Sequence, residues 1–162
     1  MNLYDLHSKP ETLKGYHQRF KVPELAYQEA INRVSSSYLG VSVVTNRGER
    51  FPDLEPAIAK SAEWAVKYAY TVIGGRFPEG EAAIAIVPHW AFQYALNVIR
   101  GRFPEGEPVI AKSPEWAVKY ARHVLKKRWR KAEPVIATDL DVWGRRYEDE
   151  FNVTFLNGKV IK

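Results

Sequence analysis

Apolar residues recur along most of this chain with the spacing of an amphipathic helix. In the clearest stretch the apolar positions are Trp116, Ala117, Val118, Tyr120, Ala121, Val124 and Leu125. Residues at this spacing share one helical face, which here covers somewhat more than half of the circumference. Ser113 is a favourable N-cap and Pro114 suits the first helical position. The pattern therefore predicts a helix that begins after Ser113 and buries a wide face.

The same pattern returns every 26 residues, in four copies. The aligned residues are Arg50, Arg76, Arg102 and Arg128; Glu55, Glu81, Glu107 and Glu133; Trp64, Trp90 and Trp116; and Tyr68, Tyr94 and Tyr120. The fourth copy slips by one residue, after which Trp143 and Tyr147 restore the spacing. Self-similarity at such a period predicts a repeat array.

We therefore expect a mainly α protein, a short αα repeat solenoid with a small β appendage. A wide apolar arc must be covered on two sides, as between stacked repeats, so the Trp and Tyr columns are predicted to be core. An exposed stacking platform for bases, or a cation cage, is the alternative. The connector 102–111 is rich in β-branched residues, but we favour a short helix there, since strands at this period would need a parallel sheet of longer runs.

The chain is predicted to have three segments within one compact domain. Residues 1–48 form an N-terminal helical cap, with a capping box at Ser8 and Glu11 and a degenerate repeat helix from Pro23, followed by a strand at 40–45. Residues 49–150 hold the four repeats. In 151–162, the Asn157-Gly158 turn predicts a β-hairpin. A lone short hairpin is marginal, so we expect it to pair with strand 40–45, in this chain or in a dimer.

Composition and motifs limit the classes of function that the chain can have. The chain has 162 residues, a formal charge of +5 and no cysteine, which excludes disulfides and thiolate metal sites. The start lacks the pattern of a signal peptide, and the longest aliphatic run, 82–87, is too short to span a bilayer. A cytoplasmic protein without membrane contact is expected. Known catalytic motifs and metal-ligand spacings are absent, so no enzyme, cofactor or metal is predicted.

The aligned Arg and Glu residues are interpreted as a structural ladder. Each Arg lies five residues before its Glu, which allows pairing within a turn or between neighbouring repeats. Exposed pairs of this kind contribute little singly, so fixing the geometry of the connector is the favoured role. Asp139 is interpreted as an N-cap of the last helix.

Departures from the repeat unit mark two candidate binding surfaces. The first is a predicted partner-binding patch on the outward helical positions, formed by Tyr70, Leu96, Arg100, Arg122 and Lys126. The second is the basic connector, formed by Lys126, Lys127, Arg128, Trp129, Arg130 and Lys131. This run suits phosphate binding with the Trp129 ring free to stack, or contact with an acidic protein. The structural alternative is a solvated charge run with Trp129 in the core position of Phe103.

The repeat resembles tandem units in uncharacterised proteins of tailed bacteriophages and related bacterial proteins. The likeness covers Arg50 to Tyr147 and is carried by motifs such as Arg-Phe-Pro-Glu-Gly-Glu-Pro at 102–108 and Ser-Pro-Glu-Trp-Ala at 113–117. It implies a phage context, in which small non-enzymatic proteins bind and redirect host machinery. We therefore expect an interaction protein that modulates a host protein in the host cytoplasm, such as a defence or nucleic-acid enzyme. Direct nucleic-acid or nucleotide binding by residues 126–131 is the alternative.

Overall fold

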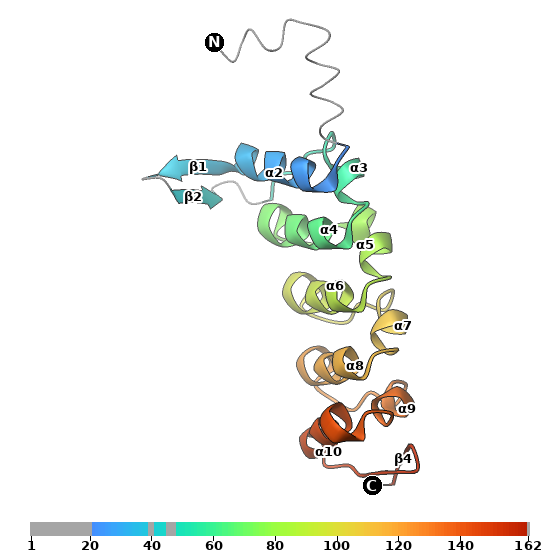
Figure 1. Cartoon of the computed structure of the whole chain (residues 1–162). Helices are drawn as coiled ribbons and strands as arrows, with labels where there is room; N and C mark the ends of the chain where they lie inside the picture. Colours follow the sequence, from blue (N-terminus) through green and yellow to red (C-terminus); the bar gives the residue numbers. More distant parts are fainter. Residues whose placement is uncertain (1–20, 39–40, 45–47, 162) are drawn as a thin grey trace, which may run out of the picture. The chain divides into compact units, whose positions relative to one another are not determined.

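The computed structural model describes residues 21–38, 41–44 and 48–161, and these are mainly helical (Figure 1). The chain divides into two compact units, Met1–Ala83 and Ile84–Lys162. The predicted capping box at Ser8 and Glu11 lies outside the described residues. The predicted segment limits at 48 and 150 are not tested by this division and stay predictions.

The first unit is built on helix α2 (Pro23–Val34), which begins at the predicted proline. It packs against α3 (Glu55–Ile58) and α4 (Ala62–Tyr68). Helix α4 continues into the π-helical turn η2 (Ala69–Ile73), and α5 (Pro78–Ile84) reaches the end of the unit. The buried residues of α2 are Ala26, Ala30 and Val34, whose four-residue spacing sets one apolar stripe against the unit.

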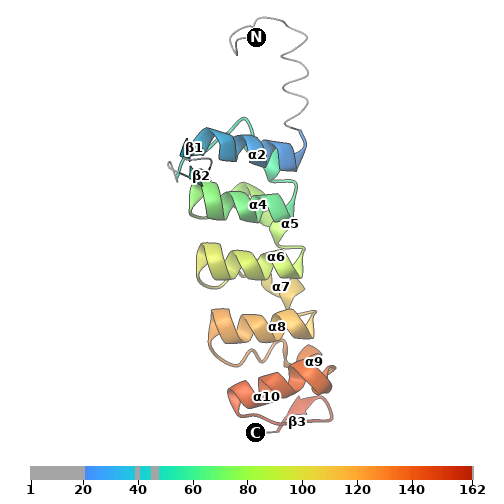
Figure 2. The ribbon, with the colours of Figure 1, turned by 60° about the vertical axis from the view of Figure 1, so that its left-hand side comes forward.

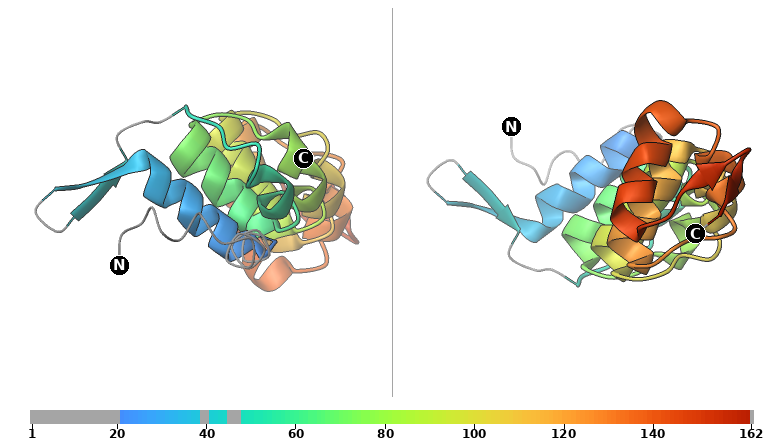
Figure 3. Two further views of the ribbon diagram at one scale, coloured as in Figure 1. Left: turned by 90° about the horizontal axis from the view of Figure 1, so that it is seen from above. Right: turned by 90° about the horizontal axis from the view of Figure 1, so that it is seen from below.

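Strand β2 (Val41–Val44) confirms the core of the predicted strand, but its partner differs from the prediction. It pairs antiparallel with β1 (Ser35–Tyr38), from Ser35 opposite Val44 to Tyr38 opposite Val41. Figure 3 shows this ribbon continuing from the end of α2. Among the described residues of this chain, β2 is paired with β1 and not with the C-terminal hairpin, which corrects the prediction of a pairing within one chain. The version that joins two chains stays a prediction. Pairing neighbouring segments closes a much shorter loop than reaching the chain end.

The second unit repeats one arrangement of long and short helices. Its long helical segments are α6 (Pro88–Gln93) with η3 (Tyr94–Ile99), α8 (Pro114–Tyr120) with η4 (Ala121–Leu125), and η5 (Leu140–Gly144) with α10 (Arg145–Phe151). The short ones are α7 (Glu107–Ile110) and α9 (Glu133–Ile136). Helix α8 contacts α6 on one side and η5 on the other, so the long helices follow one another (Figure 2).

The connector is a short helix, as predicted, rather than a strand. Helices α3, α7 and α9 each begin at the aligned glutamate, and a proline follows in the first turn, where its missing N–H is not needed. Each ends on a fully buried isoleucine, namely Ile58, Ile110 and Ile136. The connector helix therefore carries one apolar anchor per copy into the core.

Side chains cap the long helices less uniformly than the sequence predicts. The Ser61 hydroxyl accepts a hydrogen bond from the Trp64 N–H at 3.5 Å, and Asp139 accepts one from Val142 N–H at 3.2 Å. Ser113 occupies the predicted N-cap position, but its side chain makes no capping hydrogen bond. Pro114 in the first turn supplies a fixed φ there, which favours the helix start without a hydroxyl cap.

The Tyr column is core, whereas the Trp column is only partly buried. Tyr68, Tyr94, Tyr120 and Tyr147 are fully buried, as predicted. Trp64, Trp90, Trp116 and Trp143 are partly exposed, which corrects the prediction that they are core. The Lys119 ammonium lies 4.1 Å from the Trp116 ring centroid, so the ring has a charged, solvent-facing side. The column lies at the rim of the buried face.

The one-residue slip of the fourth copy is taken up inside its long helix. In the second and third copies the π-helical turn follows the α-helical part, but in the fourth η5 comes first. A π-helical turn accommodates one extra residue without ending the helix. A side chain at Gly144 would lie 2.9 Å from the Asp139 carbonyl oxygen, so this wide turn requires glycine.

The C-terminal hairpin forms with the predicted turn. Strands β3 (Phe155–Leu156) and β4 (Lys159–Val160) pair antiparallel, and Asn157 and Gly158 both have positive φ, as a type I′ turn demands. Phe155 is buried with its ring 5.9 Å from that of Tyr147, and its N–H donates to Glu148 at 2.6 Å. Among the described residues, the hairpin is thus stabilised by packing on α10 instead of by a third strand. A dimer through the hairpin stays a prediction.

Candidate functional site

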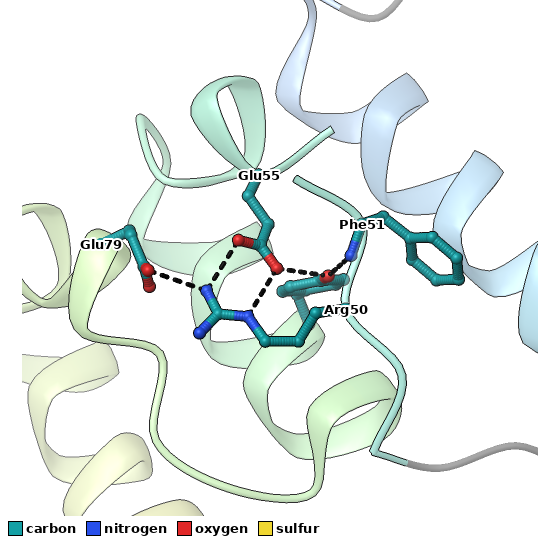
Figure 4. A network of polar contacts seen from close by, with 5 residues as sticks. Arg50, Phe51, Glu55 and Glu79 are labelled. Atoms are coloured by element: carbon teal, nitrogen blue, oxygen red, sulfur yellow. Dashed lines mark hydrogen bonds and ion pairs between the residues drawn. The ribbon is translucent and has the colours of Figure 1, made fainter. Parts of the chain in front are cut away.

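Each copy joins its aligned Arg and Glu, as the structural ladder predicts, and a tyrosine hydroxyl joins the pair in the first, third and fourth copies. In the first copy, Arg50 donates from Nε and Nη2 to the two carboxylate oxygens of Glu55, at 2.9 and 2.6 Å. The Tyr68 hydroxyl donates to Glu55 at 2.9 Å and accepts from the Phe51 N–H at 2.9 Å. Figure 4 shows Arg50 between Glu55 and Glu79, whose carboxylate it reaches at 2.8 Å.

The same contacts recur in the third and fourth copies. Tyr120 donates to Glu107 at 3.0 Å and accepts from Phe103 N–H at 2.9 Å, while Arg102 forms two bonds of 2.8 Å to that carboxylate. The corresponding residues of the fourth copy are Arg128, Trp129, Glu133 and Tyr147. In the second copy, Arg76 binds Glu81 through two bonds of 2.8 Å. The two-bond pairing of Arg with Glu therefore recurs in all four 26-residue copies of the sequence.

Within the network, the pKa of the tyrosine is raised above its ordinary value and the pKa of the glutamate is lowered below its ordinary value. Burial raises the pKa of Tyr120 to about 12, and the nearby Glu107 carboxylate contributes to the rise. Hydrogen bonds from Arg102, followed by the one from Tyr120, lower the pKa of Glu107 despite its burial. At neutral pH the carboxylate is therefore ionised and the hydroxyl neutral, which is the only pairing in which every bond described above can form.

We expect the stability of the protein to fall in both acid and alkali through this network. The folded pKa of Tyr120 lies above the unfolded value of about 10, so its contribution is complete below pH 10 and is lost as the pH rises towards 12. The lowered pKa of Glu107 gives a contribution that is complete above the ordinary carboxyl range and is lost as the pH falls. Urea titrations followed by circular dichroism between pH 3 and 11 measure both limbs.

Tyr120→Phe tests the alkaline limb, because phenylalanine has no proton to lose. Its stability should decrease less steeply between pH 9 and 11 than that of the unmodified protein. Equal alkaline slopes for the two proteins would contradict the assignment of this limb to the buried hydroxyl.

The network is a structural feature rather than an active site. Glu55, Glu107 and Glu133 are at most 9 % exposed, and their tyrosine partners are fully buried. Catalysis by these groups would require a substrate to reach atoms already bonded to one another. A binding site must therefore be sought on the surface.

A cavity of about 330 Å³ lies in the second unit, where the C-terminal ends of η3 and η4 come together. Its lining combines apolar side chains with cationic ones, namely Ala95, Leu96, Arg100, Gly101, His123, Val124 and Lys126. None of the described residues that line it is acidic. Its volume falls at the lower end of the range of small-molecule sites. We call this space the helix-end cavity.

Two cationic residues that line the helix-end cavity have a left-handed backbone conformation, which favours glycine or asparagine. Arg100 and Lys126 have φ of 56° and 54°, in the left-handed region. That conformation costs a residue with a β-carbon about 1–2 kcal/mol. Attraction of a cation to a helix C-terminus offers typically 0.3–1 kcal/mol, which does not fully offset this cost. The equivalent helix ends carry Gly74 and Asn152, which tolerate the conformation better.

The structure brings together three of the five residues of the predicted partner-binding patch. Leu96, Arg100 and Lys126 line the helix-end cavity. Arg122 instead pairs with Glu150 at 3.1 Å. Tyr70 is 48 % exposed and belongs to the other unit. His123 and Gly101 also line the cavity but were not part of the predicted patch. Their closeness in sequence to Lys126 and Arg100 is the signal that could have included them.

The basic connector divides into buried and exposed members. Trp129 is 6 % exposed, and its ring centroid lies 5.0 Å from that of Tyr120. It therefore occupies the core position that Phe103 has in the third copy, as the structural alternative predicts. Its ring is therefore not free to stack on a base, and the stacking interpretation is wrong. Arg128 is held by Glu133 in the polar network. The exposed cations are Lys126, Lys127, Arg130 and Lys131.

Other classes of site find no support in the described residues. They contain no cluster of three or more histidine, cysteine, aspartate or glutamate residues able to hold a metal ion. No helix in that part of the chain has the length and apolar character needed to cross a membrane. A scan of protein-family models finds no match to the chain, and searches of curated proteins and of solved structures find none either.

Proposed function

We propose that this chain is a non-enzymatic binding protein that recognises an acidic partner protein through the helix-end cavity and the adjoining basic connector. The observation that carries the proposal is the convergence of Leu96, Arg100 and Lys126 on one cavity. Apolar surface framed by cations gives both contact area and charge complementarity to an acidic segment. Lys126 is shared by the cavity and the connector, so the two surfaces are continuous along the chain.

A protein partner is favoured over nucleic acid by the burial of Trp129. Single-stranded nucleic acid is usually bound by exposed aromatic rings together with cations, and the described connector offers only the cations. The excess of charge is also confined to the connector 126–131, whereas the equivalent stretches contain Glu79 and Glu105. A groove that follows a phosphate backbone would repeat its cations along the array.

We further infer that the 26-residue unit builds an αα solenoid, as its period and wide apolar face predict. Support comes from the recurring polar network and from the succession of α6, α8 and η5 within the second unit. Concave or ridged surfaces of such arrays commonly bind proteins. The proposed partner is accordingly a host protein, such as a defence or nucleic-acid enzyme, encountered in the host cytoplasm.

Charge removal on the basic connector tests the proposal. The acidic host partner is first isolated from a bacterial lysate on the immobilised unmodified chain. Replacing Lys126, Lys127 and Lys131 with glutamine should slow association with that partner about tenfold, because cations at the edge of an interface mainly steer encounter. The matched control replaces three exposed lysines outside this surface, Lys60, Lys112 and Lys159, and removes the same charge. Surface plasmon resonance at two salt concentrations measures both variants. Equal association rates for the two variants would contradict the proposed surface.

Duplex DNA is the competing ligand and is measured in the same way. Binding to an acidic protein predicts negligible affinity for duplex DNA at physiological salt. A dissociation constant of about 1 μM or below, with log affinity falling linearly in log salt by about 0.9 for each phosphate contacted, would favour the nucleic-acid alternative.

A further inference from the structure

The helix-end cavity has the composition of a site for one compact anionic group. Arg100 and Lys126 come from the ends of two different helices, η3 and η4, and line the same space. Guanidinium offers a planar fork of donors, while ammonium acts as a point charge with rotatable donors. The two can therefore bind different oxygen atoms of a single tetrahedral anion.

The backbone of both helix ends is already engaged, so an anion would depend on the side chains. The N–H groups of Arg100 and Gly101 both donate to the Ala95 carbonyl. The N–H groups of Lys126 and Lys127 likewise donate to the carbonyl of Ala121. These turns thus do not present the free N–H groups that bind phosphate in backbone nests. Removal of the two cationic side chains should then abolish recognition.

The choice of residue at the two helix ends also points to a ligand. The left-handed conformation there suits glycine or asparagine, and both are found at the equivalent ends of the first and fourth copies, as Gly74 and Asn152. Strained conformations that persist against a better-suited residue are concentrated at functional sites. Here the cationic side chains are retained only at the two helix ends that share the cavity.

We infer that the helix-end cavity binds a phosphate monoester, with Arg100 and Lys126 on the phosphate and Leu96 and Val124 against the apolar or aromatic body that carries it. A monoester has nearly two negative charges and three free oxygen atoms, which matches two cations better than a carboxylate does. This inference rests on the proposed function, since it names the group through which a partner would enter the cavity. A phosphorylated side chain and a nucleoside monophosphate share this chemistry.

Isothermal titration calorimetry with phenyl phosphate tests the inference on the full chain. We expect binding to the unmodified protein at least tenfold tighter than that of benzoate, which has the same ring and a single charge. The double variant Arg100→Gly, Lys126→Gly should lose at least tenfold in affinity for phenyl phosphate. No heat of binding to the unmodified protein at millimolar phenyl phosphate, or equal affinity in the double variant, would overturn the inference.

Thermal unfolding separates lost recognition from lost structure. Glycine relieves the left-handed strain, so each of the two substitutions should raise the melting temperature, by about 2–4 °C. Asn152→Gly is the matched control, because it changes the same backbone position outside the cavity lining and should leave phenyl phosphate affinity unchanged. Loss of affinity in this control equal to that in the double variant would contradict the assignment to Arg100 and Lys126.

The source of the phosphate is distinguished by two further ligands. A short phosphotyrosine peptide that binds more tightly than adenosine monophosphate would assign the cavity to a phosphorylated partner protein, and the reverse order to a nucleotide. If phenyl phosphate does not bind but the glutamine variant of Lys126, Lys127 and Lys131 still associates more slowly with the acidic host partner, the inference fails while the proposed function stands.

Discussion

Replacement of Tyr120 with alanine is expected to lower the free energy of unfolding by about 3–5 kcal/mol. The side chain is fully buried and its ring lies 5.0 Å from that of Trp129, so truncation leaves a cavity between two parts of the core. Truncation also removes the acceptor of the Phe103 N–H and one donor to Glu107. Chemical denaturation measured at pH 7 gives the loss directly.

Tyr120→Phe divides that loss between packing and hydrogen bonding. It keeps the ring and leaves the buried Phe103 N–H without its acceptor, which should cost about 1–3 kcal/mol. The alanine variant should therefore be clearly less stable than the phenylalanine variant. If phenylalanine proved as stable as tyrosine, the hydroxyl would have no energetic role and the network would be incidental to the fold.

Replacement of Trp116 with alanine is expected to cost about 2–3 kcal/mol, less than the 3–5 kcal/mol typical of a fully buried aromatic residue. The ring contacts the preceding long helix, with centroid distances of 4.9 Å to His89 and 5.6 Å to Phe92. It is partly exposed on its other side, where Lys119 lies over it. The same denaturant titration at pH 7 measures this loss.

Lys119→Gln is the companion variant for Trp116, since it removes the cation and keeps the ring. Its effect should be small, about 0.5–1 kcal/mol, because the contact lies at a partly exposed site. A loss from Trp116→Ala below 1 kcal/mol would mean that the ring contributes no packing between successive helices. A loss as large as that of Tyr120→Ala would mean that it is buried in solution.

The helical units could be predicted because their signals are local and recur four times. The aligned Arg and Glu residues lie five positions apart, so their pairing within a turn follows from spacing alone. The tyrosine partner lies thirteen residues beyond the glutamate in the first and third copies, and its role depends on how two helices fold back on each other. The sequence signal for this role is that all four copies have tyrosine, never phenylalanine, at this position, which indicates a use for the hydroxyl.

The features that the sequence did not reveal were hidden for equally specific reasons. Strand β1 contains three successive serines, which have no strong strand preference, so the partner of β2 was not recognisable from propensity. Trp129 lies within a run of five basic residues, and its burial follows only from its alignment with Phe103. The left-handed positions of Arg100 and Lys126 are indicated in the sequence only by Gly74 and Asn152 at the equivalent places.

The buried carboxylates of the polar network each find their cation within their own copy, which has a consequence for how such a chain can change in evolution. In the first, third and fourth copies, the buried carboxylate, the guanidinium and the hydroxyl that satisfy one another all belong to the same stretch of sequence. Duplication or loss of a whole copy would therefore leave no buried carboxylate without its cation. Unequal recombination between copies can thus alter the length of the protein without passing through an intermediate that carries an orphaned charge.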